Sequence, residues 1–304
     1  MSDQADGLRE LVRARSGTTA LADPEPPPRL PSAPPKARSL VFTSGKGGVG
    51  TSNLALNLAV TLGELGQRVV LVDADLGLAN LDLLCGLSPA HDLGDVLAGE
   101  VSLAEAVTEG PAGVRFLPGA HGMRTLPDVL GDGPARLVAE LAGLEAGADL
   151  LLIDAGSGLG PGIATLAAAA DEVVVVTTPE PTGVADAHAT IGRFKRLPGV
   201  RLRVAVNQAA SADEAEDVLA RLSATSRQFL GAVVTPLGHV RSDPHVPLAV
   251  RARRPFVLAY PGSAASRGVR RIARDLLTGR PPRARRPGFF TALAARWALS
   301  RVAR

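Results

Sequence analysis

Residues 45–52 read GKGGVGTS, a run made of Gly45, Lys46, Gly47, Gly48, Val49, Gly50, Thr51 and Ser52. The run follows the apolar segment SLVFTS (39–44), which predicts a strand, and it precedes a helical pattern over 52–65. A glycine-rich loop in this position turns backbone N–H groups and a helix N-terminus toward one anion. The context predicts a phosphate-binding loop in which the Ser52 hydroxyl is a ligand for Mg²⁺. A tight glycine turn without a ligand is the alternative.

One position of this loop departs from the expected pattern G-x-x-x-x-G-K-[ST]. Thr51 stands where a lysine is expected, so the loop lacks the ammonium that contacts the β- and γ-phosphates. Losing one charge-assisted contact costs on the order of 1.5–3 kcal/mol. Lys46 is the cation that remains in the loop, and the chain has only two other lysines, Lys36 and Lys195.

Short apolar runs alternate with helical patterns after this loop. Such repeated strand-then-helix order predicts an α/β fold, a doubly wound and mainly parallel sheet with helices on both faces. Ligands of these sheets bind beyond the carboxyl ends of the strands. The predicted strands are 39–44, 68–73, 114–118, 149–154, 172–178, 202–207 and 232–238, and the clearest helices are 52–65, 183–196, 213–229 and 265–277.

Polar residues end three of these predicted strands, at the edge where the loop lies. Asp73 and Asp75 follow one strand, and we expect Asp75 to orient an attacking water with Asp73 in support. Asp154 resembles the Walker B carboxylate near Mg²⁺, and Gly158 resembles a switch glycine near the γ-phosphate. Asn207 has an amide suited to an adenine edge. For each residue taken alone, a loop cap or an ordinary turn is the alternative.

Composition divides the chain into four predicted segments. Residues 1–15 form a short helix, and 16–38 form a proline-rich linker with seven prolines. Residues 39–278 form the nucleotide-binding domain, and 279–304 form a basic linker and an amphipathic helix. Residues 280–304 hold seven arginines and no acid, which predicts an anionic partner for the tail, either a membrane or a nucleic acid.

Other features predict a cytoplasmic protein. The single cysteine, Cys85, excludes an internal disulfide bond and fits a reducing compartment. The polar N-terminus carries no signal-peptide core, and the longest apolar runs are too short to span a membrane. The five histidines lack the spacing of metal ligands.

The segment KGGVG, with Lys46 near its start, resembles the deviant Walker A motif of the MinD/ParA family. The resemblance implies a slow ATPase that uses ATP and Mg²⁺ and forms a homodimer with ATP. Lys46 would then reach the phosphates of the partner subunit and stabilise charge, while Asp75 positions the water. The metal would lie near Ser52, Asp75 and Asp154, and Asn207 would contact adenine.

Three longer segments resemble the FlhG group of this family, also called FleN or YlxH, which governs flagellar number and placement. They are DADLGLANLDLLCGL (73–87), TTPEPTGVADAHATI (177–191) and RRPFVLAYPGSAAS (253–266), and the resemblance covers about residues 39–278. It implies flagellar switch components or a transcriptional activator as further partners.

The N-terminus resembles the DQAxxLR element of the same group. There the element docks on the GTPase FlhF and stimulates its hydrolysis, so the resemblance implies an FlhF-type partner. In that role Gln4 would orient a water in the partner's site. A frayed tail is the alternative. The matching residues are Asp3, Gln4, Ala5, Leu8 and Arg9.

The C-terminus has an apolar helical stripe of Phe289, Phe290, Leu293 and Trp297 beside several arginines. A basic, aromatic, amphipathic helix predicts an anchor in an anionic membrane. MinD and FlhG use such helices when ATP-bound dimers form, which implies reversible binding at the inner face of the cell membrane. A helix packed on the protein's own body is the alternative.

Three functions therefore compete. The first is an ATP-hydrolysing switch, and the second is a nucleotide-binding scaffold that does not hydrolyse ATP because Thr51 replaces the lysine. The third is a ParA-like DNA partition ATPase that uses the arginine-rich tail. Lys46, Ser52, Asp75 and Asp154 together favour the first. The aromatic residues of the tail fit lipid better than duplex DNA, so no specific DNA binding is expected.

Overall fold

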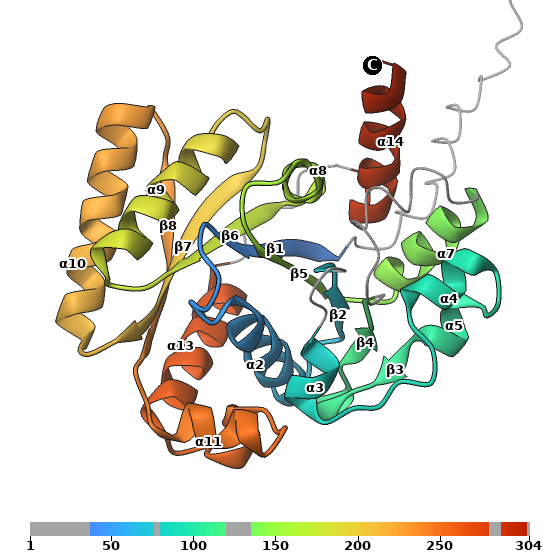
Figure 1. The fold of residues 1–304 in the computed structure, drawn as a ribbon, viewed down its shortest axis with the longest axis horizontal. Coiled ribbons are helices and arrows are strands. Elements are labelled where there is room, and N and C mark those ends of the chain that lie inside the picture. The colour runs from blue at the N-terminus through green and yellow to red at the C-terminus, as the bar shows by residue number, and fades with distance from the viewer. Residues whose placement is uncertain (1–36, 76–79, 120–134, 280–286, 303–304) are drawn as a thin grey trace, which may run out of the picture. The chain divides into compact units, whose positions relative to one another are not determined.

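The computed structural model describes residues 37–75, 80–119, 135–279 and 287–302. The chain from Pro35 to Arg304 forms one compact unit, built around a central sheet (Figure 1). The predicted GTPase-activating element at Asp3 to Arg9 lies outside the described residues, as does nearly all of the predicted linker.

The sheet has eight strands in the order β3–β4–β2–β5–β1–β6–β7–β8. Every neighbouring pair is parallel except β3 and β4, which are antiparallel. This arrangement confirms the predicted doubly wound α/β fold. The strands are β1 (Arg38–Ser44), β2 (Val69–Asp73), β3 (Thr108–Glu109), β4 (Arg115–Leu117), β5 (Leu150–Ser157), β6 (Glu172–Thr177), β7 (Arg201–Ala209) and β8 (Val234–Arg241).

Helices cover both faces of the sheet, with α2, α11 and α13 on one side and α7 to α10 on the other (Figure 1). One turn of π-helix (Ser226–Leu230) extends α10, and a short 3₁₀ turn (Pro111–Gly113) precedes β4. The α-helices are α2 (Thr51–Glu64), α3 (Leu81–Cys85), α4 (Leu93–Ala98), α5 (Leu103–Ala106), α7 (Ala135–Ala146), α8 (Pro161–Ala169), α9 (Pro181–Phe194), α10 (Ala212–Thr225), α11 (His245–Arg251), α12 (Phe256–Ala259), α13 (Ala264–Thr278) and α14 (Phe289–Val302).

Alternating side chains of the strands fill two apolar layers. In β1, Leu40 and Phe42 join the core beneath α2 and α13, whereas Val41 joins the core on the opposite face. All three side chains are fully buried. A continuous apolar run can therefore serve as a strand with both faces covered, as parallel sheets require.

A buried ionic cluster joins the beginnings of three strands. The carboxylate of Glu172, which is inaccessible to solvent, accepts hydrogen bonds from Arg38 Nε at 2.6 Å and from Arg201 at 3.0 Å. Arg203 lies 3.4 Å from its second oxygen. Burial lowers the pKa of Arg38, and the adjacent carboxylate opposes that shift. Glu172 therefore compensates a guanidinium that has almost no contact with water.

The C-terminal helix corrects one expectation. Phe289, Phe290 and Leu293 are buried against α7 and α8 instead of facing outward. The buried carboxylate of Glu145 accepts hydrogen bonds from the N–H groups of Phe289 (2.8 Å) and Phe290 (3.3 Å), which caps the helix. These side chains gain more from the protein's own core than from solvent, so in this conformation they are not available to a membrane. The Trp297 side chain lies outside the described part.

No helix within the described ranges is long and apolar enough to cross a membrane.

Candidate functional site

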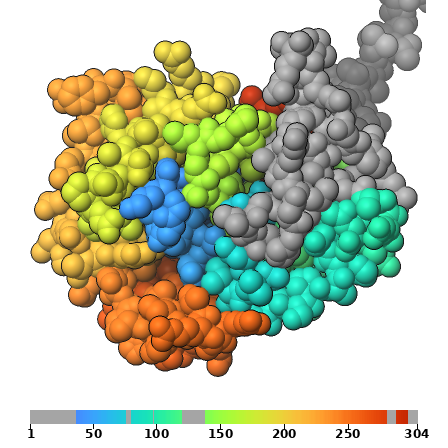
Figure 2. Space-filling model, viewed as in Figure 1, coloured from blue at the N-terminus to red at the C-terminus, as the bar shows by residue number. Residues whose placement is uncertain are grey.

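The glycine-rich loop joins the carboxyl end of β1 to the beginning of α2. Gly48 and Gly50 have φ angles of +83° and +87°, which favour glycine. A Cβ on Gly50 would also collide with the side-chain amide of Asn207. Figure 2 shows this part of the chain, in blue, at the surface between the segments around α8 and α9 and the segment around α11. The loop is therefore accessible to a ligand from solvent.

The loop borders a cavity of about 320 Å³. Ser52 and Asp75 line it, together with Gly156 at the end of β5. The structure thus brings together residues from three strand ends, as the sequence predicted for a phosphate site. Gly158 lies just beyond this wall, where its N–H donates to the carbonyl oxygen of Ser44 at 2.8 Å.

Two buried carboxylates lie behind this wall. Burial raises the pKa of Asp154 to about 6, although a hydrogen bond from the Ser52 hydroxyl opposes the shift. Burial, and then the charge of Asp154, raise the pKa of Asp73 to about 7. Both shifts show that negative charge is poorly compensated at this strand edge, as expected of a place that takes up a cation.

The oxygen donors here fit Mg²⁺. This ion prefers one or two carboxylates and substrate phosphates to a cage made of protein ligands alone. The Ser52 hydroxyl and the Asp154 carboxylate are hydrogen-bonded partners, and Asp75 lines the same cavity. No group of three or more acidic, histidine or cysteine residues that could hold a metal occurs among the described residues.

Asp73 has a different position from the one expected. Its carboxylate accepts hydrogen bonds from the N–H groups of Asp75 at 3.2 Å, Asn80 at 3.1 Å and Leu81 at 3.2 Å. It is not in the cavity wall, so its contacts fix the backbone on either side of residues 76–79. Asp73 thereby fixes the backbone of Asp75, and the catalytic support predicted for it stays a prediction.

Lys46 is not among the residues that line the phosphate cavity of its own chain. Its ammonium lies 3.6 Å from the carboxylate of Glu180, and both side chains are largely exposed. Thr51 is buried, and its hydroxyl donates to the Ser44 hydroxyl at 3.0 Å. Ser44 in turn donates to the carbonyl oxygen of Lys46 at 2.9 Å.

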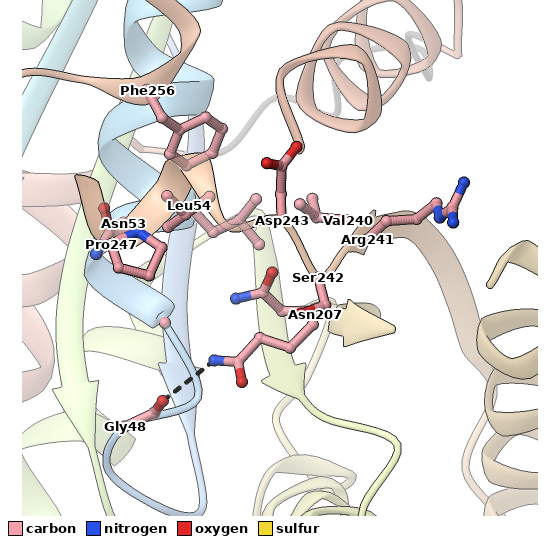
Figure 3. Close-up of a pocket in the computed structure, with 13 residues that line it drawn as sticks. Gly48, Asn53, Leu54, Asn207, Val240, Arg241, Ser242, Asp243, Pro247 and Phe256 are labelled. Carbon is pink, nitrogen blue, oxygen red and sulfur yellow. Dashed lines mark hydrogen bonds between the residues drawn. The ribbon is translucent and has the colours of Figure 1, made fainter. Parts of the chain in front are cut away.

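A second cavity, of about 290 Å³, adjoins the same loop (Figure 3). Asn207 lines it and donates to the carbonyl oxygen of Val49 at 2.8 Å. Apolar residues form another part of its wall, among them Leu54, Pro247 and Phe256. An apolar slot with an amide at its edge, next to a phosphate loop, has the size and chemistry for a nucleoside.

Sequence reasoning missed Asp243, which lies in this second wall. Its carboxylate accepts hydrogen bonds from the N–H groups of His245 and Ala265, each at 3.0 Å. Burial would raise its pKa, but these bonds, with one from Ser263, hold the pKa well below its usual range. Asp243 therefore fixes the end of β8 to the beginnings of α11 and α13. The predicted strand ended at residue 238, whereas β8 ends at Arg241, so Asp243 was not placed next to the end of a strand.

Comparison with known families gives one match over most of the chain. Residues 40–251 match the model of the CobQ/CobB/MinD/ParA nucleotide binding domain. The matched region includes every described residue predicted for the nucleotide site and the whole lining of the phosphate cavity.

Individual relatives point in the same direction. The chain is 37% identical to the antiactivator FleN of Pseudomonas aeruginosa over 238 residues, which cover 78% of this chain and 85% of FleN. It is 31% identical to the flagellum site-determining protein YlxH of Helicobacter pylori, over 77% and 80% of the two chains. Among solved structures, MinD of Pyrococcus horikoshii complexed with Mg-ADP superposes with a TM-score of 0.63 at 28% identity, over 80% of this chain and 98% of that chain.

Proposed function

This chain belongs to the CobQ/CobB/MinD/ParA family of nucleotide-binding proteins, and we propose that it is an ATP-dependent, dimerising switch that hydrolyses ATP slowly. The predicted resemblance to the FlhG group is confirmed by its similarity to FleN and YlxH. We therefore place its action in the control of flagellar number and placement.

One observation carries the enzymatic part of this proposal. Ser52, Asp154 and Asp75 converge beside a phosphate-sized cavity under the N-terminus of α2. A nucleoside-sized cavity adjoins it across the same loop. An ATP molecule would place its base near Asn207 and its γ-phosphate near Asp75.

The residues divide the chemistry among them. The loop N–H groups bind the phosphates, while Ser52 and Asp154 would hold Mg²⁺, which supplies charge neutralisation at the β- and γ-phosphates. Asp75 accepts a hydrogen bond from the water that attacks the γ-phosphate in line. Lys46 supplies positive charge to the second subunit of the dimer, a role supported by its exposed position and its absence from the lining of its own cavity.

The test is steady-state ATP hydrolysis, measured together with sedimentation of the purified full chain. We expect wild type to dimerise with ATP and to turn over slowly, and Lys46→Ala to do neither. The control is Lys195→Ala, because Lys195 contacts a carbonyl oxygen of Leu230 far from the loop. Dimerisation without turnover would favour the alternative function, a scaffold that binds ATP but does not hydrolyse it because Thr51 replaces the lysine. If the wild-type protein neither dimerises with ATP nor hydrolyses it, the proposal is contradicted.

The nucleoside cavity gives a separate prediction. Asn207→Ala removes the amide from its wall and the bond to Val49, so we expect ADP affinity to fall about tenfold. Gln228→Ala is the matched control, since its exposed amide lines neither cavity. Calorimetric titration with ADP measures both variants. Equal affinities in wild type and Asn207→Ala would show that the base binds elsewhere.

We further propose that a partner GTPase of the FlhF type binds residues 1–15. The motif of Asp3, Gln4, Ala5, Leu8 and Arg9 supports this proposal. The test adds the full chain to such a GTPase and measures GTP hydrolysis. Stimulation by wild type and its loss in Gln4→Ala are expected, whereas equal rates with and without the chain would contradict the idea.

Membrane association is proposed as a step that requires release of α14. In the described conformation Glu145 caps this helix and its phenylalanines are buried. Glu145→Ala leaves two buried N–H groups without that acceptor, so we expect a larger fraction bound to anionic liposomes in the absence of ATP. Flotation measures the fraction, and Glu100→Ala, which changes an exposed carboxylate, is the control. An unchanged fraction with and without ATP would argue that α14 is a permanent part of the core.

A further inference from the structure

Thr51 and Lys46 together indicate how nucleotide affinity is controlled, an inference that rests on the proposed ATP-dependent dimer. We propose that each phosphate site has a single lysine, contributed by the other subunit, so that nucleotide binds weakly to a monomer and tightly only as the dimer forms. Dimerisation would then be a condition of tight binding as well as a result of it.

Thr51 occupies the position where a second lysine is expected. Thr51 lines the phosphate cavity at the first residue of α2, where a longer side chain would reach toward the phosphates. Its hydroxyl is already used, because it donates to Ser44, which donates to the carbonyl oxygen of Lys46. Thr51 thus braces the backbone of the loop but brings no positive charge to it.

No other positively charged side chain in the described lining of the phosphate cavity replaces the missing lysine. None of the described residues that line the phosphate cavity carries a positive charge. Arg241 is in the wall of the neighbouring nucleoside cavity, but its side chain extends away from the labelled residues around it (Figure 3). It donates instead to the carbonyl oxygen of Ala210 at 3.1 Å. Within the described part, the chain therefore offers its own phosphates only neutral donors.

In the single chain Lys46 forms an ion pair with Glu180. Its ion pair with Glu180 is 3.6 Å long, and the two side chains are 48% and 67% exposed. Exposed pairs of this kind contribute little stability, so separating them opposes dimerisation only slightly. Lys46 therefore lies beside Glu180 near solvent, where a second subunit can approach it, and not in the lining of its own cavity.

ATP binding and association of the subunits are linked equilibria. If the trans lysine supplies the charge-assisted contact, ATP affinity and subunit affinity rise together. The apparent affinity for ATP then increases with protein concentration. After hydrolysis and separation of the subunits, ADP is held by a site without a lysine and leaves rapidly, so the switch resets without an exchange partner.

The test restores the missing charge in the full chain. Thr51→Lys is compared with wild type and with Thr51→Gln, which adds length without charge. Calorimetry with Mg²⁺ and ADP is done at concentrations where sedimentation shows monomers. We expect Thr51→Lys to bind ADP about 10- to 100-fold more tightly, and Thr51→Gln to remain near wild type.

A second arm needs wild type alone. Its apparent ATP affinity is measured over a wide range of protein concentrations, and we expect it to rise with concentration. Constant ATP affinity, or equal ADP affinity in wild type and a folded Thr51→Lys, would overturn the inference. In either case turnover and dimerisation with ATP would leave the proposed function intact. Absence of both from every variant would instead reject that function.

Discussion

Asp75→Asn is expected to reduce ATP turnover by at least about a hundredfold while the protein still dimerises with ATP. The size follows from the usual contribution of a residue that positions and activates a nucleophile. Asparagine keeps the shape of the side chain, which packs against Gly156, but it is a poor acceptor for the proton of water. In the proposed mechanism ATP binding depends on the loop N–H groups and on Lys46 of the other subunit, so we expect the dimer to accumulate.

Two measurements separate this effect from a general loss of folding. Single-turnover hydrolysis reports the chemical step, and sedimentation with ATP reports the dimer. Asp82→Asn, on α3 outside the cavity wall, is the matched control and is expected to resemble wild type. Wild-type turnover in Asp75→Asn would remove Asp75 from the mechanism. Loss of the dimer in that variant would give Asp75 a role in binding.

The largest stability effect is expected at Glu172. Glu172→Ala leaves the buried guanidinium of Arg38 without its carboxylate, and breaking one side of a buried ion pair costs about 3–5 kcal/mol. Arg201 and Arg203 contact the same carboxylate, so three cations would then face one another at the beginnings of β1, β6 and β7. Repulsion among them adds to the desolvation cost of Arg38.

Equilibrium unfolding in urea measures this prediction through the free energy of unfolding. The comparison is Asp149→Ala, which breaks the pair between Asp149 and Arg68 at the surface. Because water solvates that arginine after the change, only a small loss is expected. A Glu172→Ala protein as stable as Asp149→Ala would show that the Glu172 cluster is hydrated in solution.

The sequence predicted the strands and the phosphate site because their signals are local. Apolar runs gave five of the eight strands to within two residues at either end, namely β1, β2, β4, β6 and β7, whereas β5 and β8 each continue three residues past the predicted end. The glycine-rich loop, Ser52 and the acids at strand ends were found because parallel strands bring their carboxyl ends to one edge.

Other features of the fold depend on tertiary contacts, which local sequence patterns do not reveal. The two-residue strand β3 is too short to show a periodic pattern of apolar residues. The strand β8 continues to Arg241, three residues past the predicted end at residue 238. That error hid Asp243. The apolar stripe of α14 has the same pattern whether it faces lipid or α7 and α8, so only the fold reveals its burial.

The central place of β1 has a consequence for the order of events during synthesis. Arg38 pairs with Leu150 of β5, and Leu40 pairs with Glu172 of β6. The strand β1 therefore has neither of its two neighbours in the sheet until more than a hundred further residues have been made. Until then its apolar side chains and both its edges remain unprotected, a condition that favours aggregation and slow folding. We therefore expect the nascent chain to depend on chaperones until β5 and β6 are complete.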